Sequence, residues 1–152
     1  MRDSGRGGEF GGLGNPGGAR PFRQVLDRLR QAGLRPTRQR LALARLLFDG
    51  RRRHISAEDL HNEALATGFR VSLATVYNTL HQFTSAGLLR EIVVDPGRSY
   101  FDTNVANHHH FYFEKSGRVE DIPGDAMVVT GMPAAPPGTT VRSVEVIVRV
   151  DG

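Results

Sequence analysis

The chain has 152 residues, of which 39% are apolar and 24% charged, and its formal net charge is +4. This length accommodates one ordinary domain or two small ones, and the composition is that of a globular protein. The absence of cysteine excludes a disulfide framework and a thiolate zinc cluster. No stretch predicts a transmembrane helix or a secretory signal, so we expect a cytoplasmic protein without a membrane partner.

Charge is distributed unevenly along the chain. Residues 1–100 contain 16 arginines against 9 acidic residues, whereas residues 101–152 contain 4 basic and 7 acidic residues. A basic first part followed by an acidic second part indicates that the first part meets a polyanion such as DNA. Arginine provides nearly all of the positive charge, and a GC-rich genome would explain that without any nucleic-acid partner.

The predicted elements begin after a glycine-rich stretch. Residues 1–19 contain too few apolar side chains to offset the entropy of ordering the backbone, so they predict a disordered tail. Apolar residues then recur at helical spacing in four segments, each with a start signal and a glycine at its end. The predicted helices cover residues 21–33, 37–50, 56–68 and 72–87, and begin at Pro21, Thr37, Ser56 and Ser72.

The last two predicted helices carry apolar faces. In the third helix, Leu60 and Leu65 are predicted to point inward. The fourth helix has an apolar stripe predicted to be buried, formed by Leu73, Val76, Tyr77, Leu80 and Phe83. Its opposite face is polar and predicted to point outward, with Thr75, Asn78, Thr79 and Gln82.

Strands are predicted after the fourth helix. Residues 88–94 and 99–102 predict a hairpin around an Asp-Pro-Gly turn. Helices followed by a two-stranded hairpin predict a winged helix-turn-helix over residues 20–103. Residues 103–107 predict a hinge, and residues 108–152 a second small domain. In that domain we expect strands at 108–113, 118–122 and 144–150, a short helix within 123–131 and a proline-rich loop at 133–138. The predicted fold class is α+β.

A winged helix-turn-helix places its last helix in the major groove of DNA, where side chains in the first half of that helix read base edges. Short polar side chains occupy these positions here, namely Ser72, Thr75 and Asn78. Nearby arginines predict contacts to phosphates or the minor groove: Arg38, Arg40, Arg70 and Arg98. Polar residues on an exposed helix face are often only solvated. The combination of helix caps, glycine stops, a wing and excess positive charge is therefore stronger evidence for DNA binding than any single residue.

Three consecutive histidines, His108, His109 and His110, are the second functional signal. Imidazole is the commonest protein ligand of transition metals and also ligates haem, so the run predicts a metal or haem site. Side chains alternate along a strand, so we expect His108 and His110 to share a face while His109 points the other way. One small ion should therefore not bind all three. The alternative is a surface hinge with incidental imidazoles.

Several stretches together resemble the ferric uptake regulator family. They are HISAEDL at 54–60, SLATVYNTL at 72–80, AGL at 86–88, RSYFD at 98–102, the histidine run and GRV at 117–119. The resemblance extends over about residues 21–122. It implies a homodimer with N-terminal winged helices and a small C-terminal α/β dimerisation and effector-sensing domain. Such a dimer binds AT-rich palindromic DNA and responds to metal, peroxide or haem. The resemblance also implies that Tyr77 contacts DNA.

The resemblance further implies one regulatory metal site, held by His54, Asp102, His108, His110 and Asp121. Three imidazoles and two carboxylates suit Zn(II), Mn(II) or Fe(II). Because His54 and Asp102 precede the hinge, an ion shared with the second domain would lock the angle between the domains.

The chain departs from many family members in its histidines and its missing cysteines. Many members have a structural Cys-x-x-Cys zinc site where residues 113–116 here read Phe-Glu-Lys-Ser, so we expect no structural zinc. The histidine run, the lack of cysteine and the short ending look most like the iron response regulator branch. That branch implies haem-linked iron sensing near residues 108–110 and, with it, a haem-delivering partner protein.

We therefore expect a dimeric transcription regulator of iron homeostasis that is not an enzyme. A peroxide, manganese or zinc sensor is the alternative within the family. A small metalloenzyme would need a substrate pocket and a separate general base, which the sequence does not supply. A winged-helix protein with inert histidines would bind DNA identically with metal, haem or chelator. The apolar strand at 144–150 is expected to build the dimer sheet, because an open apolar edge favours association.

Overall fold

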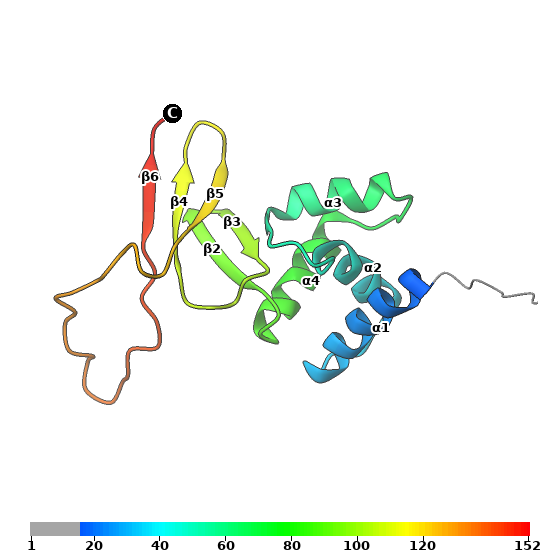
Figure 1. Cartoon of the computed structure of the whole chain (residues 1–152), viewed down its shortest axis with the longest axis horizontal. Helices are drawn as coiled ribbons and strands as arrows, with labels where there is room; N and C mark the ends of the chain where they lie inside the picture. Colours follow the sequence, from blue (N-terminus) through cyan, green and yellow to red (C-terminus); the bar gives the residue numbers. More distant parts are fainter. Residues whose placement is uncertain (1–15) are drawn as a thin grey trace, which may run out of the picture.

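A computed structural model describes residues 16–152, so most of the predicted tail, residues 1–15, lies outside the described residues. Four helices come first: α1 (Pro16–Gln31), α2 (Arg38–Leu47), α3 (Ala57–Ala66) and α4 (Leu73–Ser85). A short strand β1 (His54–Ile55) precedes α3, and the hairpin of β2 (Arg90–Asp95) and β3 (Arg98–Asp102) follows α4. The last three strands are β4 (His109–Phe113), β5 (Arg118–Ile122) and β6 (Ile147–Val150). Figure 1 shows the hairpin between the helices and these last strands.

Three of the helices begin at the predicted capping residues. The side chains of Thr37, Ser56 and Ser72 each accept a hydrogen bond from the backbone N–H three residues later, at the starts of α2, α3 and α4. These bonds satisfy backbone donors that have no partner within the helix. The capping predictions are therefore confirmed.

The start of the first helix was predicted wrongly. α1 begins at Pro16, so residues 16–19 of the expected tail are helical and Pro21 lies inside the helix. The preference of proline for the first helical position is met by Pro16 instead of Pro21.

Two predicted side-chain orientations are also wrong. Leu65 is 46% exposed, because it lies five residues after Leu60 and is therefore rotated by roughly 140° from it around the helix. Ala64 takes the inward position instead. Thr79 is buried, since its hydroxyl donates to the carbonyl oxygen of Thr75 at 2.8 Å and so needs no water.

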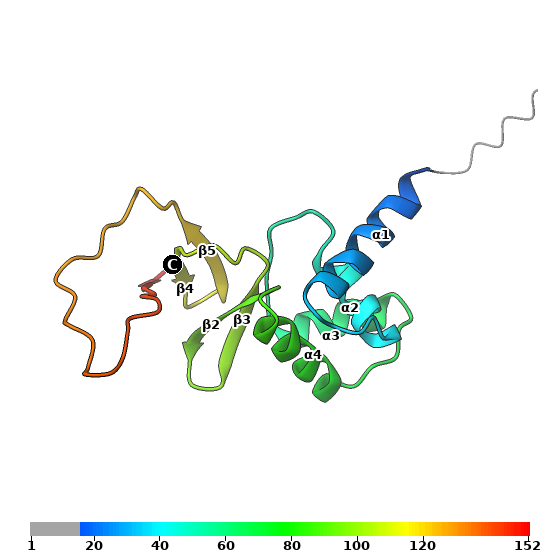
Figure 2. The same ribbon diagram turned by 90° about the horizontal axis from the view of Figure 1, so that it is seen from below.

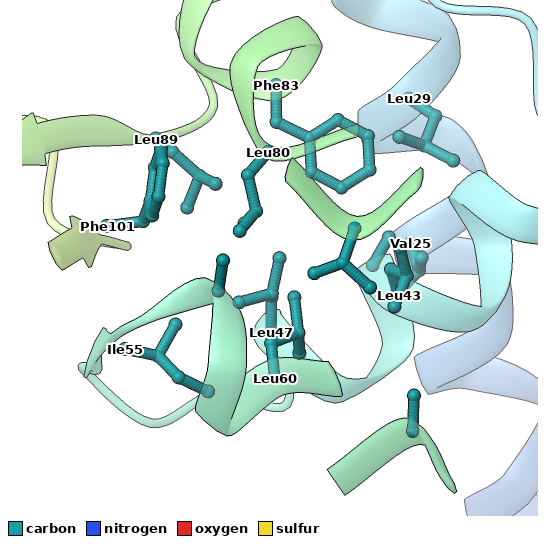
Figure 3. Packing of buried hydrophobic residues seen from close by; sticks show 14 residues of the cluster. Val25, Leu29, Leu43, Leu47, Ile55, Leu60, Leu80, Phe83, Leu89 and Phe101 are labelled. Carbon is teal, nitrogen blue, oxygen red and sulfur yellow. The ribbon is translucent and has the colours of Figure 1, made fainter. Parts of the chain in front are cut away.

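The helical domain is built on one apolar core. Side chains from all four helices meet there with Ile55 of β1, Leu89 and Phe101 of β3, as Figure 3 shows. Leu43, Leu47, Leu60, Leu80 and Phe83 are fully buried. The core thereby orients α4 relative to α2 and α3, which leaves Asn78 and Gln82 on the outer face of α4 exposed to solvent.

The hairpin belongs to a three-stranded sheet in the order β1-β3-β2. β1 was not predicted from the sequence, because two residues are too short to display an alternating pattern. It pairs antiparallel with the end of β3, so that His54 lies opposite Asp102 and Ile55 opposite Phe101. This pairing attaches the segment before α3 to the wing.

The second sheet has the order β5-β4-β6. β5 pairs antiparallel with β4, with His110 opposite Asp121, and β6 pairs parallel with β4. β6 is shorter than predicted, since its pairing partner β4 has only five residues.

The predicted helix within 123–131 is absent. Residues 123–146 form no helix or strand, and Figures 1 and 2 show them as a long loop that joins β5 to β6 and projects away from the helices. So short a helix is unstable unless an apolar face packs on a neighbour, and Val128 is 81% exposed.

The two domains are in direct contact through the hairpin. Ile92 and Val94 of β2 pack against Tyr112 of β4 and Val119 of β5 in a small apolar cluster. Ion pairs surround it: Arg90 with Glu145 at 3.2 Å, and Arg149 with Asp95 at 3.0 Å. None of the helices in the described residues is long and apolar enough to span a bilayer.

Candidate metal centre and nucleic-acid interface

The candidate metal centre is assembled from one cross-strand pair in each sheet. His54 and Asp102 face each other across β1 and β3, and His110 and Asp121 face each other across β4 and β5. His108, just before β4, completes the group. One atom from each of the five residues lies within 4.8 Å of the others, so the structure brings together every ligand expected from the sequence.

The distances within this group are short and uniform. The three Nε2 atoms each approach two carboxylate oxygens, Oδ2 of Asp102 and Oδ1 of Asp121. The six separations are 3.1 and 2.7 Å for His54, 2.9 and 2.9 Å for His108, and 3.1 and 3.3 Å for His110. Donors held about 2.1 Å from one ion and at right angles to each other would lie ~3.0 Å apart. The spacing of the donors therefore fits a single small cation.

The position of the proton on His108 also indicates that a cation belongs in this group. The Nδ1 of His108 faces the carbonyl oxygen of Ala106 at 2.5 Å and must donate to it. A neutral His108 then presents the lone pair of Nε2 to two carboxylate oxygens, which are acceptors as well. Acceptors repel each other at this distance unless a proton or a metal ion lies between them. The group thus requires positive charge at its centre.

The close approach of imidazoles and carboxylates in this group shifts the pKa values of His54 and Asp102. Burial alone would lower the pKa of His54, but hydrogen bonding and attraction from Asp102, followed by Asp121, outweigh burial and raise that pKa above its usual value. Burial alone would raise the pKa of the Asp102 carboxyl. Hydrogen bonds from His110, His54 and the backbone N–H of Asn104 instead hold that pKa well below its usual range.

The three consecutive histidines point in two directions, as predicted. His108 and His110 contribute to the centre, whereas the Nδ1 of His109 accepts a hydrogen bond from the backbone N–H of Val146 at 3.0 Å. His109 therefore supports the junction before β6 and contributes no ligand to the five-residue group. Where many family members have the Cys-x-x-Cys element, Phe113 ends β4 and residues 114–116 lie in the turn to β5, so this stretch contains no sulfur donor.

The predicted DNA-reading residues lie at the start and along the outer face of α4. Asn78 is exposed and Thr75 half-buried, while the hydroxyl of Ser72 is used to cap the helix. Arg38 at the start of α2 and Arg70 in the loop before α4 are exposed. These five residues remain available to a duplex, apart from the capping hydroxyl.

Two further DNA-contact candidates make intramolecular contacts. Tyr77 donates its hydroxyl to Glu58 of α3 at 2.8 Å, and Arg98 donates to the hydroxyl of Tyr112 at 3.0 Å. Arg98 was expected at the DNA surface of the wing, but here it joins the wing to the second domain. Neither Glu58 nor Tyr112 was identified from the sequence, because each partner lies 14 or more residues away from the residue it contacts.

Comparisons with known proteins agree with this geometry. The model of the ferric uptake regulator family matches residues 31–136. The ferric uptake regulation protein of Legionella pneumophila is 39% identical over 97 residues, which are 63% of this chain and 71% of that protein. The peroxide-responsive repressor PerR of Staphylococcus aureus is 38% identical over 95 residues, which are 62% of this chain but only 63% of that protein.

A solved structure extends the similarity to the fold. The ferric uptake regulator of Pseudomonas aeruginosa with manganese is 27% identical, with a TM-score of 0.62 over 84% of this chain and 97% of that one. The architecture matches as well, with an N-terminal helical DNA-binding domain, a wing and a C-terminal dimerisation domain. The chain therefore belongs to the ferric uptake regulator family, whose members are transcription regulators and not enzymes.

Proposed function

We propose that this protein is a dimeric transcription regulator of iron homeostasis that binds AT-rich palindromic DNA when a divalent metal occupies the His54/Asp102/His108/His110/Asp121 centre. The observation that carries the proposal is the convergence of these five donors within 4.8 Å. No other group of described residues combines three imidazoles with two carboxylates in this way.

The position of the centre supports a regulatory role. His54 and Asp102 belong to the sheet of the DNA-binding domain, whereas the other three residues come from the second domain. A divalent ion would neutralise the two carboxylates and be ligated by the three imidazoles. The five residues would then hold the two domains at one angle, which sets the distance between the two reading helices of a dimer.

The donor set limits the candidate ions. Nitrogen and carboxylate oxygen donors without thiolate favour Zn(II), Mn(II) or Fe(II) over softer metals. We infer that one of these three is the regulatory ion, and the manganese-containing relative from Pseudomonas aeruginosa supports that choice. A structural zinc held by four cysteines is not part of this proposal, because the chain has no cysteine.

The dimer in this proposal would form through the second domain. β6 is an edge strand, and the neighbouring segment exposes Val128, Val129, Met132 and Val141. Exposed apolar surface next to an unpaired edge favours association. Light scattering at micromolar concentration is expected to give twice the chain mass, and a monomer would contradict this part of the proposal.

A DNA-binding titration tests the function. Labelled duplexes carrying AT-rich palindromes are titrated with protein in Mn(II), Zn(II), Fe(II) or chelator, with the Asp102→Asn variant in parallel. His109→Ala serves as the matched control, because its imidazole lies outside the five-residue centre. We expect metal-dependent binding for the wild type and His109→Ala, and loss of that dependence in Asp102→Asn. Equal affinity with metal and chelator would identify a winged-helix protein with inert histidines.

The same titration separates the responses known in the family. Treatment of the metal-loaded protein with peroxide tests the peroxide alternative, for which the similarity to the staphylococcal repressor is the support. Addition of haem tests the predictions of the iron response regulator branch, namely haem binding near His108, His109 and His110 and a haem-delivering partner. These predictions rest on sequence features alone. Haem ligation through His108 or His110 would have to displace that residue from Asp102 and Asp121.

A further inference from the structure

A polar groove separates the start of α2 from the outer face of α4. Its volume is about 320 Å³, and its lining consists of Thr37, Gln39, Arg40, Thr75, Asn78, Thr79 and Gln82. Every lining residue is polar, and no carboxylate is among them. The N-terminal end of α2, where the helix dipole is positive, lies beside the groove because Thr37 caps that helix.

Arg40 is held in this groove by three hydrogen bonds. Its Nε and Nη2 donate to the Oε1 of Gln82 at 3.1 and 3.0 Å, and its Nη1 donates to the carbonyl oxygen of Arg35 at 3.0 Å. A guanidinium has five N–H groups, so two remain, one on each terminal nitrogen. Arg40 is thus fixed in position while part of its donor capacity stays free.

The same contact determines the orientation of the Gln82 amide. Arginine has no acceptor, so the oxygen of the amide must face Arg40 and the NH₂ group must be the free end. A glutamine that reads adenine uses both its oxygen and its NH₂ group. Since the oxygen of Gln82 is already engaged, the Arg40–Gln82 pair presents only donors to the groove.

Resting on the proposed DNA binding, we propose that the Arg40–Gln82 pair is a phosphate-binding unit for the duplex backbone, and that Gln82 does not read bases. Donors next to a helix N-terminus and away from carboxylates suit a phosphate oxygen. Gln82 also lies in the last turn of α4, about 10 Å along the helix axis from Thr75, whereas base edges are read from the first half of such a helix.

The test compares Gln82→Glu with Gln31→Glu, a matched change of charge at an exposed residue at the end of α1. The carboxylate in Gln82→Glu still accepts from Arg40, so the melting temperature should not fall. It replaces donors with negative charge, so we expect roughly a tenfold to hundredfold loss of affinity. The loss should be the same for every duplex sequence, and the slope of log affinity against log salt should become shallower by about 1. Gln31→Glu should bind as the wild type does.

Gln82→Ala is the second variant, in case the glutamate variant folds poorly. It removes the amide donors without adding charge, so a smaller but equally sequence-independent loss is expected. A loss confined to particular base substitutions would identify Gln82 as a base reader and overturn the proposal. Wild-type affinity in both variants would also overturn it while leaving DNA binding intact. A wild-type protein that binds no duplex under any metal condition would instead refute the proposed function itself.

Discussion

Asp102 is a buried carboxylate at the centre of the candidate metal site. Its side chain is fully buried, yet it remains a carboxylate because His54, His108 and His110 all lie within 3.1 Å of it. Its second oxygen accepts the backbone N–H of Asn104 at 2.8 Å, which fixes the direction of the carboxylate. A buried charge of this kind is stable only when its partners are complete.

Loss of one donor should therefore weaken metal binding strongly. Changes in residues around metal ligands typically cost 10–100-fold in affinity, so we expect His110→Ala or Asp102→Asn to cost about 100-fold or more. His109→Ala should stay close to wild type, because His109 lies outside the centre. Competition against a fluorescent chelator measures the affinities. Similar affinities in all three variants would place the metal elsewhere.

Metal affinity should also depend on pH. The raised pKa of His54 means that this imidazole keeps its proton to a higher pH than a free histidine. In the metal-free protein, its pairing with Asp102 and Asp121 stabilises the fold below the unfolded-state pKa, and this stabilisation is lost as pH rises through the folded-state pKa.

A metal ion binds only the unprotonated imidazole, so the affinity of the protein for the ion should rise with pH, whereas the stabilisation of the metal-free fold by protonated His54 falls. We expect the affinity to fall as the pH is lowered through the raised pKa of His54, by about tenfold per pH unit for the proton that the ion displaces from this imidazole. Chelator competition at several pH values checks this. An affinity that does not change as the pH passes through this pKa would exclude His54 as a ligand.

At the scale of elements, the reading helix α4 depends on its cap. The Oγ of Ser72 accepts the backbone N–H of Thr75 at 3.1 Å, and the carbonyl of Ser72 accepts the N–H of Val76 at the same distance. The cap thus defines where the polar reading face begins. Local signals of this kind are encoded within four residues, which explains why the starts of α2, α3 and α4 were predictable while the pairing of β1 with β3 was not.

Removal of this cap should destabilise the protein measurably. Ser72→Ala is expected to lower the free energy of unfolding by about 1 kcal/mol and to weaken DNA binding through fraying of the first turn of α4. Ser85→Ala, at the other end of the same helix, is the control. Urea denaturation followed by circular dichroism gives both values, and equal stability of the two variants would contradict the role of the cap.

At the scale of the whole molecule, the wing connects the reading helix to the second domain. Ile92 and Val94 pack on Tyr112 and Val119, and Arg149 donates to the carbonyl oxygen of Val94 and pairs with Glu114 and Asp95. An interdomain cavity of about 510 Å³ lies beside this contact, between the start of α3 and the turns at Gly97 and Gly117. The domains are thus joined at the wing and by the contact of His54 with Asp121 in the candidate metal centre, and the cavity lies beside the wing.

Metal should therefore stabilise both domains together. An ion that binds only the folded protein at 100 times its dissociation constant adds about 2.7 kcal/mol to the stability. Calorimetry with Zn(II) or Mn(II) is expected to show a higher melting temperature and a single transition, and neither effect should occur in Asp102→Asn. A shift confined to one of two separate transitions would show that the centre does not join the domains.

The sequence by itself determined the helix caps, the wing, the α+β class and the identity of the five candidate ligands. These follow from local patterns or from short stretches in a characteristic order. Only the tertiary structure decided that β1 pairs with β3, that Arg40 holds Gln82 42 residues away, and that residues 123–146 form no helix. Contacts between distant segments depend on how apolar faces pack and on which strands find a partner, and no local spacing along the chain encodes that.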